Sequence, residues 1–216
     1  MTLVEFFVDG MLKASDTTAP FSFAWDTLTA AEGARSLTAK AYDASSNVGT
    51  SAAVAVTVRN QANGAELIVN GSFEGATAAP WAFSGNAWLS TAGYSHGGTR
   101  YAAFGNSNNA SGAMYQTVAM PASASGTLTF WLNVTSSETT TTTVRDRLHV
   151  EVRSTSGALL ATLATFSNLN KAAPRVYTQR SVGLAAWKGQ TVRVQFRVTT
   201  DGLLATAFRV DDVSLR

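Results

Sequence analysis

The stretch TLTFWLNV at residues 127–134 decides the fold, because its apolar side chains fall at every second position. This period places successive side chains on opposite faces of a β-strand and buries one of those faces. The same alternation recurs in RLHVEVR at 147–153 and in TVRVQFRV at 191–198. Strands of this kind, separated by loops rich in Gly, Asn and Ser and by no helical pattern, predict two packed antiparallel sheets.

Composition agrees with an all-β chain and narrows the function. The 216 residues include 16 Lys and Arg against 14 Asp and Glu, and charged residues make up 14% of the chain. Because the cations form no run, nucleic acid is not an expected partner. The chain contains no Cys, which excludes disulfides, thiol catalysis and thiolate metal sites. No stretch approaches the roughly 20 apolar residues of a membrane span, and the chain starts without the basic and apolar regions of a signal peptide.

The first 60 residues predict about five short strands. Val4, Phe6 and Val8 share one face, and Asp9-Gly10 supplies a hairpin turn. Alternation returns at residues 21–25, 37–41 and 54–58, with turn residues between these segments.

This segment resembles the second part of the immunoglobulin-like repeats of secreted bacterial enzymes. The resemblance lies in VEFFVDG (4–10), DTTAPFSFAWDT (16–27) and SLTAKAYDASSNVGTSAAVAVTV (36–58). It implies an immunoglobulin-like sandwich over residues 1–60 that lacks its first strands. The polar residues 61–65 break the alternation and predict a linker.

Residues 66–216 resemble the galactose-binding-like jelly rolls of carbohydrate-binding modules. The resemblance lies in ELIVNGSFE (66–74), YSHGGTRYAAFG (94–105) and FRVDDVSL (208–215). TSSETTTTT (135–143) and KGQTVRVQFRVTTD (188–201) are similar to C-terminal accessory domains of secreted bacterial peptidases. The two resemblances imply a secreted, non-catalytic accessory module of a bacterial hydrolase. Its partners would be the catalytic domain of that hydrolase and a polysaccharide or other glycan. The alternative is a structural spacer or docking domain of a secreted peptidase, without affinity for glycans.

A structural Ca²⁺ site is implied by the same resemblance. Its ligands would be the carboxylates of Glu74 and Asp211, with carbonyls from around Asn70 and Arg100. The alternation of the last strand slips at Asp211-Asp212, which predicts a β-bulge that redirects a carboxylate, and either aspartate remains a possible ligand. Alternatively, these acids cap a strand end or form ion pairs with Arg100 or Arg209.

Sugar binding requires an exposed aromatic ring beside planar polar side chains. Strict alternation turns Trp131 away from the core face, and it does the same to a polar set on two other strands. If the three strands are neighbours, Trp131 shares one surface with this polar set, which consists of Arg147, His149, Glu151, Arg193, Gln195 and Arg197. The alternative is a solvated outer face with Trp131 covered by a loop.

Trp88 and Tyr94 are the second aromatic candidates, since they lie in or beside loops and line a pocket if they do not simply pack. The two histidines, His96 and His149, have no zinc-binding spacing. No nucleophile elbow, phosphate-binding loop or paired glycosidase acids are recognisable. We therefore expect a monomeric binding module and no catalytic residues.

Overall fold

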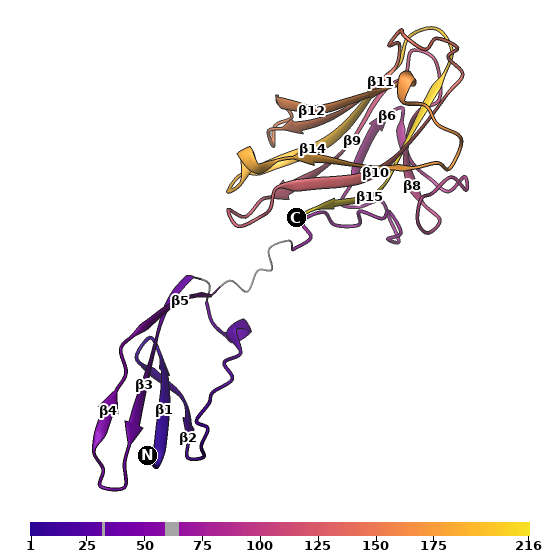
Figure 1. Ribbon diagram of the computed structural model, residues 1–216. Coiled ribbons are helices and arrows are strands. Elements are labelled where there is room, and N and C mark those ends of the chain that lie inside the picture. Colours follow the sequence, from indigo (N-terminus) through magenta and orange to yellow (C-terminus); the bar gives the residue numbers. More distant parts are fainter. Residues whose placement is uncertain (32, 59–64) are drawn as a thin grey trace. The chain divides into compact units, whose positions relative to one another are not determined.

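The structure is a computed structural model that describes residues 1–31, 33–58 and 65–216. It consists of two compact units, Met1–Ala62 and Asn63–Arg216 (Figure 1). Almost all of the predicted linker, residues 61–64, lies outside the described residues. Within these described ranges, the regular elements are strands and three single-turn 3-10 helices, η1 Thr27–Thr29, η2 Asn168–Asn170 and η3 Ala185–Trp187. In the part of the chain that the structure describes, no helix is long and apolar enough to cross a membrane.

The first unit is one antiparallel sheet in the order β2-β1-β3-β4, with β5 also paired to β3. Its strands are β1 Leu3–Val8, β2 Met11–Asp16, β3 Gly33–Tyr42, β4 Val48–Thr50 and β5 Val54–Val58. Asp9 and Gly10 both adopt positive φ in the β1–β2 turn, as the hairpin requires. The alternating segment 21–25 is not a strand, although Phe23 packs on Phe6 with ring centroids 5.9 Å apart.

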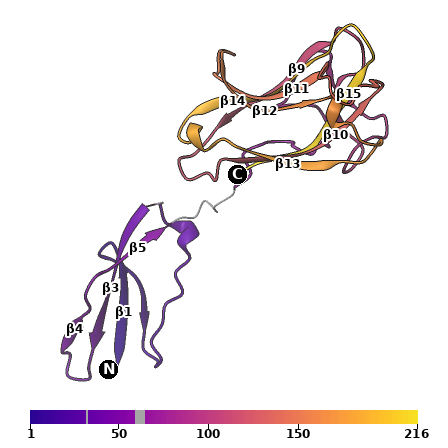
Figure 2. The ribbon, with the colours of Figure 1, turned by 45° about the horizontal axis from the view of Figure 1, so that its top comes forward.

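The second unit is a sandwich of two five-stranded antiparallel sheets, which are visible as two layers in Figure 2. We call the sheet β13-β10-β15-β8-β7 the terminal sheet, because it contains the last strand, and β12-β11-β14-β9-β6 the arginine sheet. The terminal sheet consists of β7 Ala87–Ser90, β8 Tyr101–Gly105, β10 Thr127–Ser136, β13 Thr178–Gly183 and β15 Thr206–Leu215. The arginine sheet consists of β6 Ala82–Gly85, β9 Ser111–Ala119, β11 Arg147–Arg153, β12 Leu159–Ser167 and β14 Thr191–Thr199.

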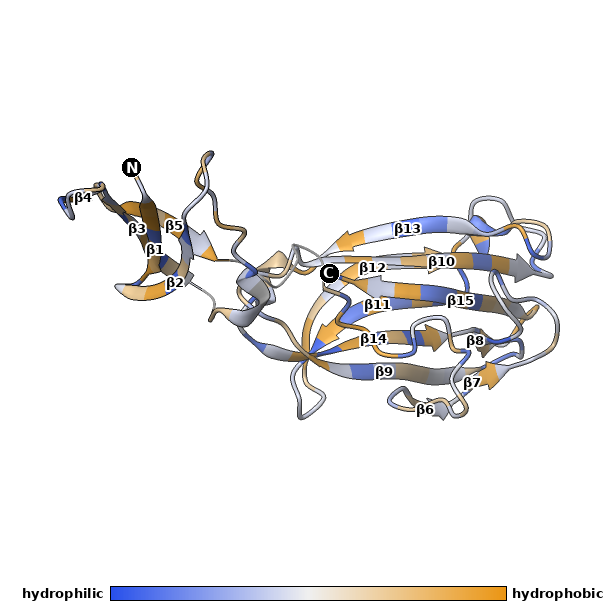
Figure 3. Ribbon diagram, turned by 90° about the horizontal axis from the view of Figure 1, so that it is seen from below, coloured by the Kyte–Doolittle hydropathy of each residue, from blue (hydrophilic) through white to orange (hydrophobic). Residues whose placement is uncertain are grey.

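The core lies between these sheets and is formed by the alternating apolar residues. Orange and blue alternate along β11 and β15 in Figure 3, as expected for strands with one buried face. The largest completely buried side chains include Phe73, Phe104, Phe130, Phe196 and Phe208. Burying each such side chain contributes about 1.5–3 kcal/mol. The predicted all-β class, with an immunoglobulin-like part followed by a jelly-roll sandwich, is confirmed.

The predicted bulge in the last strand is also confirmed. Trp131 of β10 pairs with Asp211 of β15, but Thr129 pairs with Ser214, so β15 carries one extra residue. The extra residue of the bulge is Asp212, whose backbone has a positive φ of 46°. Consequently Val210 and Val213 both point into the core, whereas Asp211 lies on the outer side of the terminal sheet.

Candidate functional site

Trp131 is covered by a loop and is not a free platform. The imidazole of His96 stacks on its indole, with ring centroids 3.9 Å apart and an interplanar angle of 16°. Tyr177 contacts the same imidazole edge-on, with a centroid distance of 5.3 Å. The alternative in which a loop covers Trp131 is therefore the arrangement that the structure adopts.

Two aspartates hold His96 in this position. Its Nδ1 lies 2.7 Å from Oδ2 of Asp212. Its backbone N–H donates to Oδ2 of Asp211 at 2.8 Å, and Gly97 N–H donates to the same oxygen at 3.2 Å. The bulge thus aims one carboxylate at the loop backbone and the other at the imidazole.

Asp211 is a fully buried carboxylate that forms no ion pair with any described residue. Burial raises its pKa to about 6, although hydrogen bonds from the backbone amides of His96 and Asp212 act in the opposite direction. A buried carboxylate without a cationic partner is costly, and in this structure the backbone N–H groups of His96, Gly97 and Asp212 are its hydrogen-bond donors.

Glu74 holds the other end of the same loop. Its carboxylate accepts the backbone N–H of Thr99 at 2.8 Å and that of Arg100 at 2.6 Å, and the Thr99 hydroxyl lies 3.0 Å away. These amide bonds, the one from Arg100 first, lower the pKa of Glu74. The guanidinium of Arg100 donates to the carbonyl of Gly75. Among the described residues, neither Glu74 nor Asp211 forms an ion pair with Arg100 or Arg209.

Asn70 fits the predicted metal site poorly. Its carbonyl already accepts the N–H of Phe73 at 3.2 Å and the indole N–H of Trp81 at 3.0 Å. Its side-chain oxygen accepts the N–H of Gly75 at 2.9 Å. In the described part of the chain, no group of three or more His, Cys, Asp or Glu side chains is arranged to hold a metal ion. A cation at this loop would therefore depend on Glu74 and Asp211 together with backbone carbonyls.

Trp88 and Tyr94 line one pocket on the outer side of the terminal sheet, with a volume of ≈ 190 Å³. Trp88 is 39% exposed. The guanidinium of Arg209 lies 4.5 Å from the ring centroid of Tyr94. It also donates to Asn133 Oδ1 at 3.1 Å and to Thr135 Oγ1 at 2.8 Å, which fixes its position.

Strand register explains why a hollow forms there. Trp88, Ala103 and Arg209 occupy one row across β7, β8 and β15, with the small alanine in the middle. Ala207 contributes a second small side chain to the lining. The chain therefore places two large planar groups beside small neighbours, which leaves a concave surface with aromatic walls. Trp88 and Tyr94 were predictable from the sequence, whereas Arg209 and the alanines were not, because their row depends on which strands pair.

The polar candidates lie on the other sheet. His149 and Arg197 pair across β11 and β14, as do Glu151 with Gln195 and Arg153 with Arg193. Trp131 belongs to the terminal sheet, so the predicted common surface of Trp131 with Arg147, His149, Arg193 and Gln195 does not form. Of the three strands that would have to be neighbours, only β11 and β14 lie side by side, and β10 belongs to the other sheet.

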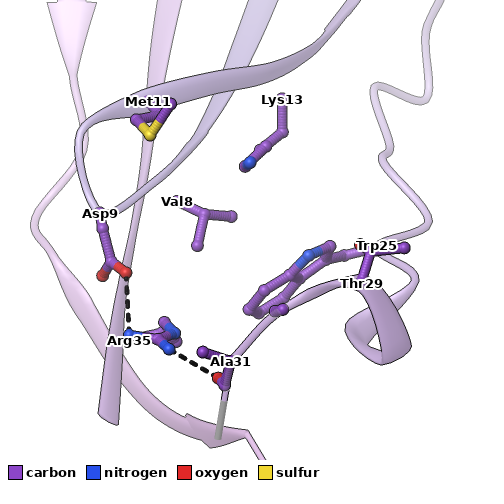
Figure 4. A pocket seen from close by; sticks show the side chains of 9 residues that line it. Val8, Asp9, Met11, Lys13, Trp25, Thr29, Ala31 and Arg35 are labelled. Carbon is purple, nitrogen blue, oxygen red and sulfur yellow. Dashed lines mark hydrogen bonds and ion pairs between the residues drawn. The ribbon is translucent and has the colours of Figure 1, made fainter. Parts of the chain in front are cut away.

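The first unit has a pocket of its own, of ≈ 310 Å³, between the β1–β2 hairpin and the segment 25–31 (Figure 4). Trp25 forms one wall, and Arg35 forms an ion pair with Asp9 at 3.4 Å. Arg35 also donates to the carbonyl of Ala31 at 2.6 Å. These bonds tie Arg35 of β3 to the β1–β2 turn and to the segment before β3, and we assign this pocket no function.

Comparison with known proteins gives a family match at the N-terminus and a set of similar solved structures. Residues 1–39 match the family model for a bacterial Ig domain. The chain matches none of the curated proteins. Among solved structures it is similar to TmCBM61, a protein determined in complex with β-1,4-galactotriose, with 15% identity and a TM-score of 0.52. That similarity covers 70% of this chain and 98% of TmCBM61.

Two further solved structures are similar at lower scores. The K3 adhesin domain of Lys-gingipain from Porphyromonas gingivalis w83 has 19% identity, covers 70% of this chain and 99% of its own, and gives a TM-score of 0.46. The module CBM28, specific for non-crystalline cellulose, has 11% identity, covers 71% and 96% of the two chains, and gives a TM-score of 0.47. Because only TmCBM61 exceeds 0.5 among these three, the fold assignment depends on it. The chain thus joins a segment that matches a bacterial Ig domain to a β-sandwich with the fold of a carbohydrate-binding module.

Proposed function

We propose that the second unit is a non-catalytic carbohydrate-binding module of a secreted bacterial hydrolase, and that the pocket of Trp88 and Tyr94 receives a sugar ring. The observation that supports this proposal is the exposed indole of Trp88 beside the fixed pair of Tyr94 and Arg209. The apolar face of a sugar ring stacks on an aromatic side chain, and its hydroxyls need planar or hydroxylic partners. Arg209 and Asn106 provide such partners in the pocket lining.

The small volume of the pocket limits the contact to about one sugar ring, so a single contact is weak. A weak site is sufficient for an accessory module. It tethers the catalytic domain to a polymeric substrate and raises the effective concentration of that substrate at the active site. The immunoglobulin-like unit would separate the two domains.

Replacing Trp88 with alanine is expected to abolish binding of the sugar. The substitution removes the stacking surface but leaves the core unchanged, because the indole is 39% exposed. We would titrate β-1,4-galactotriose, the ligand of TmCBM61, into the full chain by calorimetry after a glycan array, and we expect a loss of at least about tenfold in affinity. Leu203→Ala, at a side chain 49% exposed and outside the pocket, is the matched control and should leave binding unchanged.

An array on which the unmodified chain retains no glycan would contradict this proposal. It would support the alternative function, a spacer or docking domain of a secreted peptidase. Equal losses for Trp88→Ala and Leu203→Ala would contradict the assignment of the pocket alone.

We also propose that Ca²⁺ stabilises the loop 96–100, with Glu74 and Asp211 as its carboxylate ligands. Ca²⁺ takes six to eight oxygens, so backbone carbonyls of the glycine-containing loop would complete its shell. The buried position of Asp211 without an ion-pair partner supports this proposal. The bound ion would act structurally, by neutralising the two carboxylates and fixing the loop that carries His96.

Added Ca²⁺ is expected to raise the melting temperature of the chelator-treated chain. Binding to the folded state alone contributes about 2.7 kcal/mol at a concentration of about 100 times Kd. For a unit of this size that corresponds to a shift of about 5–10 °C. Asp211→Asn should remove the shift, whereas Asp146→Asn, which changes a carboxylate that is equally buried and hydrogen-bonded to the Asp201 N–H, should retain it. An unchanged melting temperature for the unmodified chain would rule the site out.

A further inference from the structure

The outer face of the arginine sheet carries an excess of positive charge that the fold does not neutralise. The five strands of this sheet contain four arginines, Arg147, Arg153, Arg193 and Arg197, and a single acid, Glu151. Strand register places the arginines on the two adjacent strands β11 and β14, on the side away from the core. Alternate residues of a strand lie roughly 6.6 Å apart and neighbouring strands about 4.8 Å apart, so the four arginines lie along one two-strand band that is about 20 Å long from Arg147 to Arg153.

Glu151 lies within this band and holds two of the arginines in fixed positions. It is completely buried. Its Oε1 accepts Arg197 Nε at 2.9 Å and Nη2 at 2.8 Å, and its Oε2 accepts Arg153 Nε at 2.8 Å. The amide of Gln195 lies 3.3 Å from the same Oε2. One carboxylate thus orders two guanidinium groups but neutralises only one charge.

The other two arginines have no counter-charge among the residues that the structure describes. Arg147 is exposed and forms no ion pair with a described residue. The guanidinium of Arg193 lies 4.5 Å from the ring centroid of Tyr115, and its Nε is buried without a hydrogen-bond partner in the described part of the chain. Arg193 also lies directly opposite Arg153 across the two strands. Like charges in such a pair are destabilising, so stability alone gives no reason for this arrangement.

We propose that this arginine face, Arg147, Arg153, Arg193 and Arg197, binds a polysaccharide that carries anionic groups, as a site separate from the Trp88 pocket. Guanidinium groups form paired, charge-assisted hydrogen bonds with carboxylates and sulfates, and the ordered pair on Glu151 reduces the entropy lost on binding. The outer face of the sheet admits an extended chain, and hydroxyls that suit sugar hydroxyls flank the arginines: Thr117 lies opposite Arg193, and Thr162 and Thr165 lie opposite Glu151 and His149. A single-stranded nucleic acid fits less well, because the two aromatic rings that β9 and β11 carry on this face are already engaged: Arg193 covers Tyr115, and the imidazole of His149 is hydrogen-bonded to the Thr165 hydroxyl at 3.1 Å.

The test is affinity electrophoresis of the full chain in gels that contain polygalacturonate, dextran sulfate, neutral dextran or poly(dT). Polygalacturonate and dextran sulfate distinguish carboxylate from sulfate as the recognised group. We expect retardation by at least one of them, none by dextran, and weakening with salt, since exposed charges are screened within about 10 Å at 0.1 M. The double variant Arg147→Ala/Arg193→Ala should bind at least about tenfold more weakly.

The matched control is Arg175→Ala/Arg216→Ala, which removes the same charge from exposed positions outside the arginine sheet. It should weaken binding by less than about threefold. Equal losses in the two double variants, equal retardation by poly(dT), or no retardation by either anionic glycan would each overturn the proposal. Trp88→Ala should retain polyanion binding while it loses galactotriose, so failure of this site and failure of the pocket give different results.

Discussion

Replacing Gly71 with alanine is expected to destabilise the second unit by about 3 kcal/mol or more. A Cβ atom at this position would lie 1.9 Å from the carbonyl oxygen of Val213 and 3.1 Å from the side chain of Ile68. The first of these atoms belongs to the backbone of β15 and cannot rotate away. Either the loop or the last strand must move.

The expected loss of stability is large because this contact joins the first segment of the second unit to its last strand. The N–H of Val213 donates to the carbonyl of Gly71 at 2.9 Å, and the N–H of Leu67 donates to the carbonyl of Leu215 at 2.8 Å. Displacing residue 71 would therefore disturb the segment of β15 that contains the bulge. Asp211 and the loop that covers Trp131 depend on the same segment.

Urea unfolding of the full chain, followed by tryptophan fluorescence, measures this effect, because four of the five tryptophans lie in the second unit. The matched control is Gly183→Ala at the end of β13, where a Cβ atom would have no neighbour within 4 Å. That variant should differ from the unmodified chain by less than about 0.5 kcal/mol. Similar losses of unfolding free energy in both variants would mean that the close approach of Gly71 to Val213 does not stabilise the sandwich.

Period-two alternation was sufficient to predict β10, β11, β14 and β15 and which face of each is buried, but not the other strands of the second unit. Residues 128–134 and 192–198 show this most clearly, since their apolar side chains form much of the core. The bulge at Asp212 was also predictable, because one extra residue shifts the alternation and the shift is visible in the sequence. Both features are local, so neighbouring residues determine them.

Sheet membership was not predictable from the same pattern. Trp131 and Arg193 both lie at outward positions, but β10 and β14 belong to different sheets, and alternation carries no information about strand order. The loop contact that covers Trp131 was not predictable from the sequence for a similar reason. His96 comes from a loop 35 positions earlier in the chain, and only the bulged aspartates bring it onto the indole. Contacts between distant segments determined the candidate sites more than any motif did.

Replacing Glu151 with glutamine is expected to lower the free energy of unfolding at pH 7 by about 3 kcal/mol. Burial alone would raise the pKa of Glu151, but the hydrogen bonds from Arg197 and Arg153 outweigh it and hold that pKa below its ordinary value. The ionised form is therefore the stabilising one. The substitution leaves two ordered guanidinium groups without their carboxylate, beside Arg193 and Arg147, which form no ion pair with a described residue either.

The pH dependence separates this effect from a simple loss of packing. Because the pKa of Glu151 is lowered on folding, its contribution is complete above the ordinary glutamate value of about 4.3 and disappears as the pH falls through the lowered value. The stability difference between the unmodified chain and Glu151→Gln should therefore shrink on acidification, whereas a packing defect would persist. Arg216→Ala, which removes an exposed partner 3.9 Å from Glu66, is the control and should cost less than about 1 kcal/mol at either pH.

A difference that stays constant from pH 7 to pH 3 would contradict the electrostatic role of Glu151. The result also bears on the arginine face, because Glu151 is the group that orders Arg153 and Arg197 there. If the variant folds but binds anionic glycans more weakly despite its greater positive charge, the geometry of the guanidinium groups matters more than their number. Stronger binding would show that net charge alone attracts the polymer.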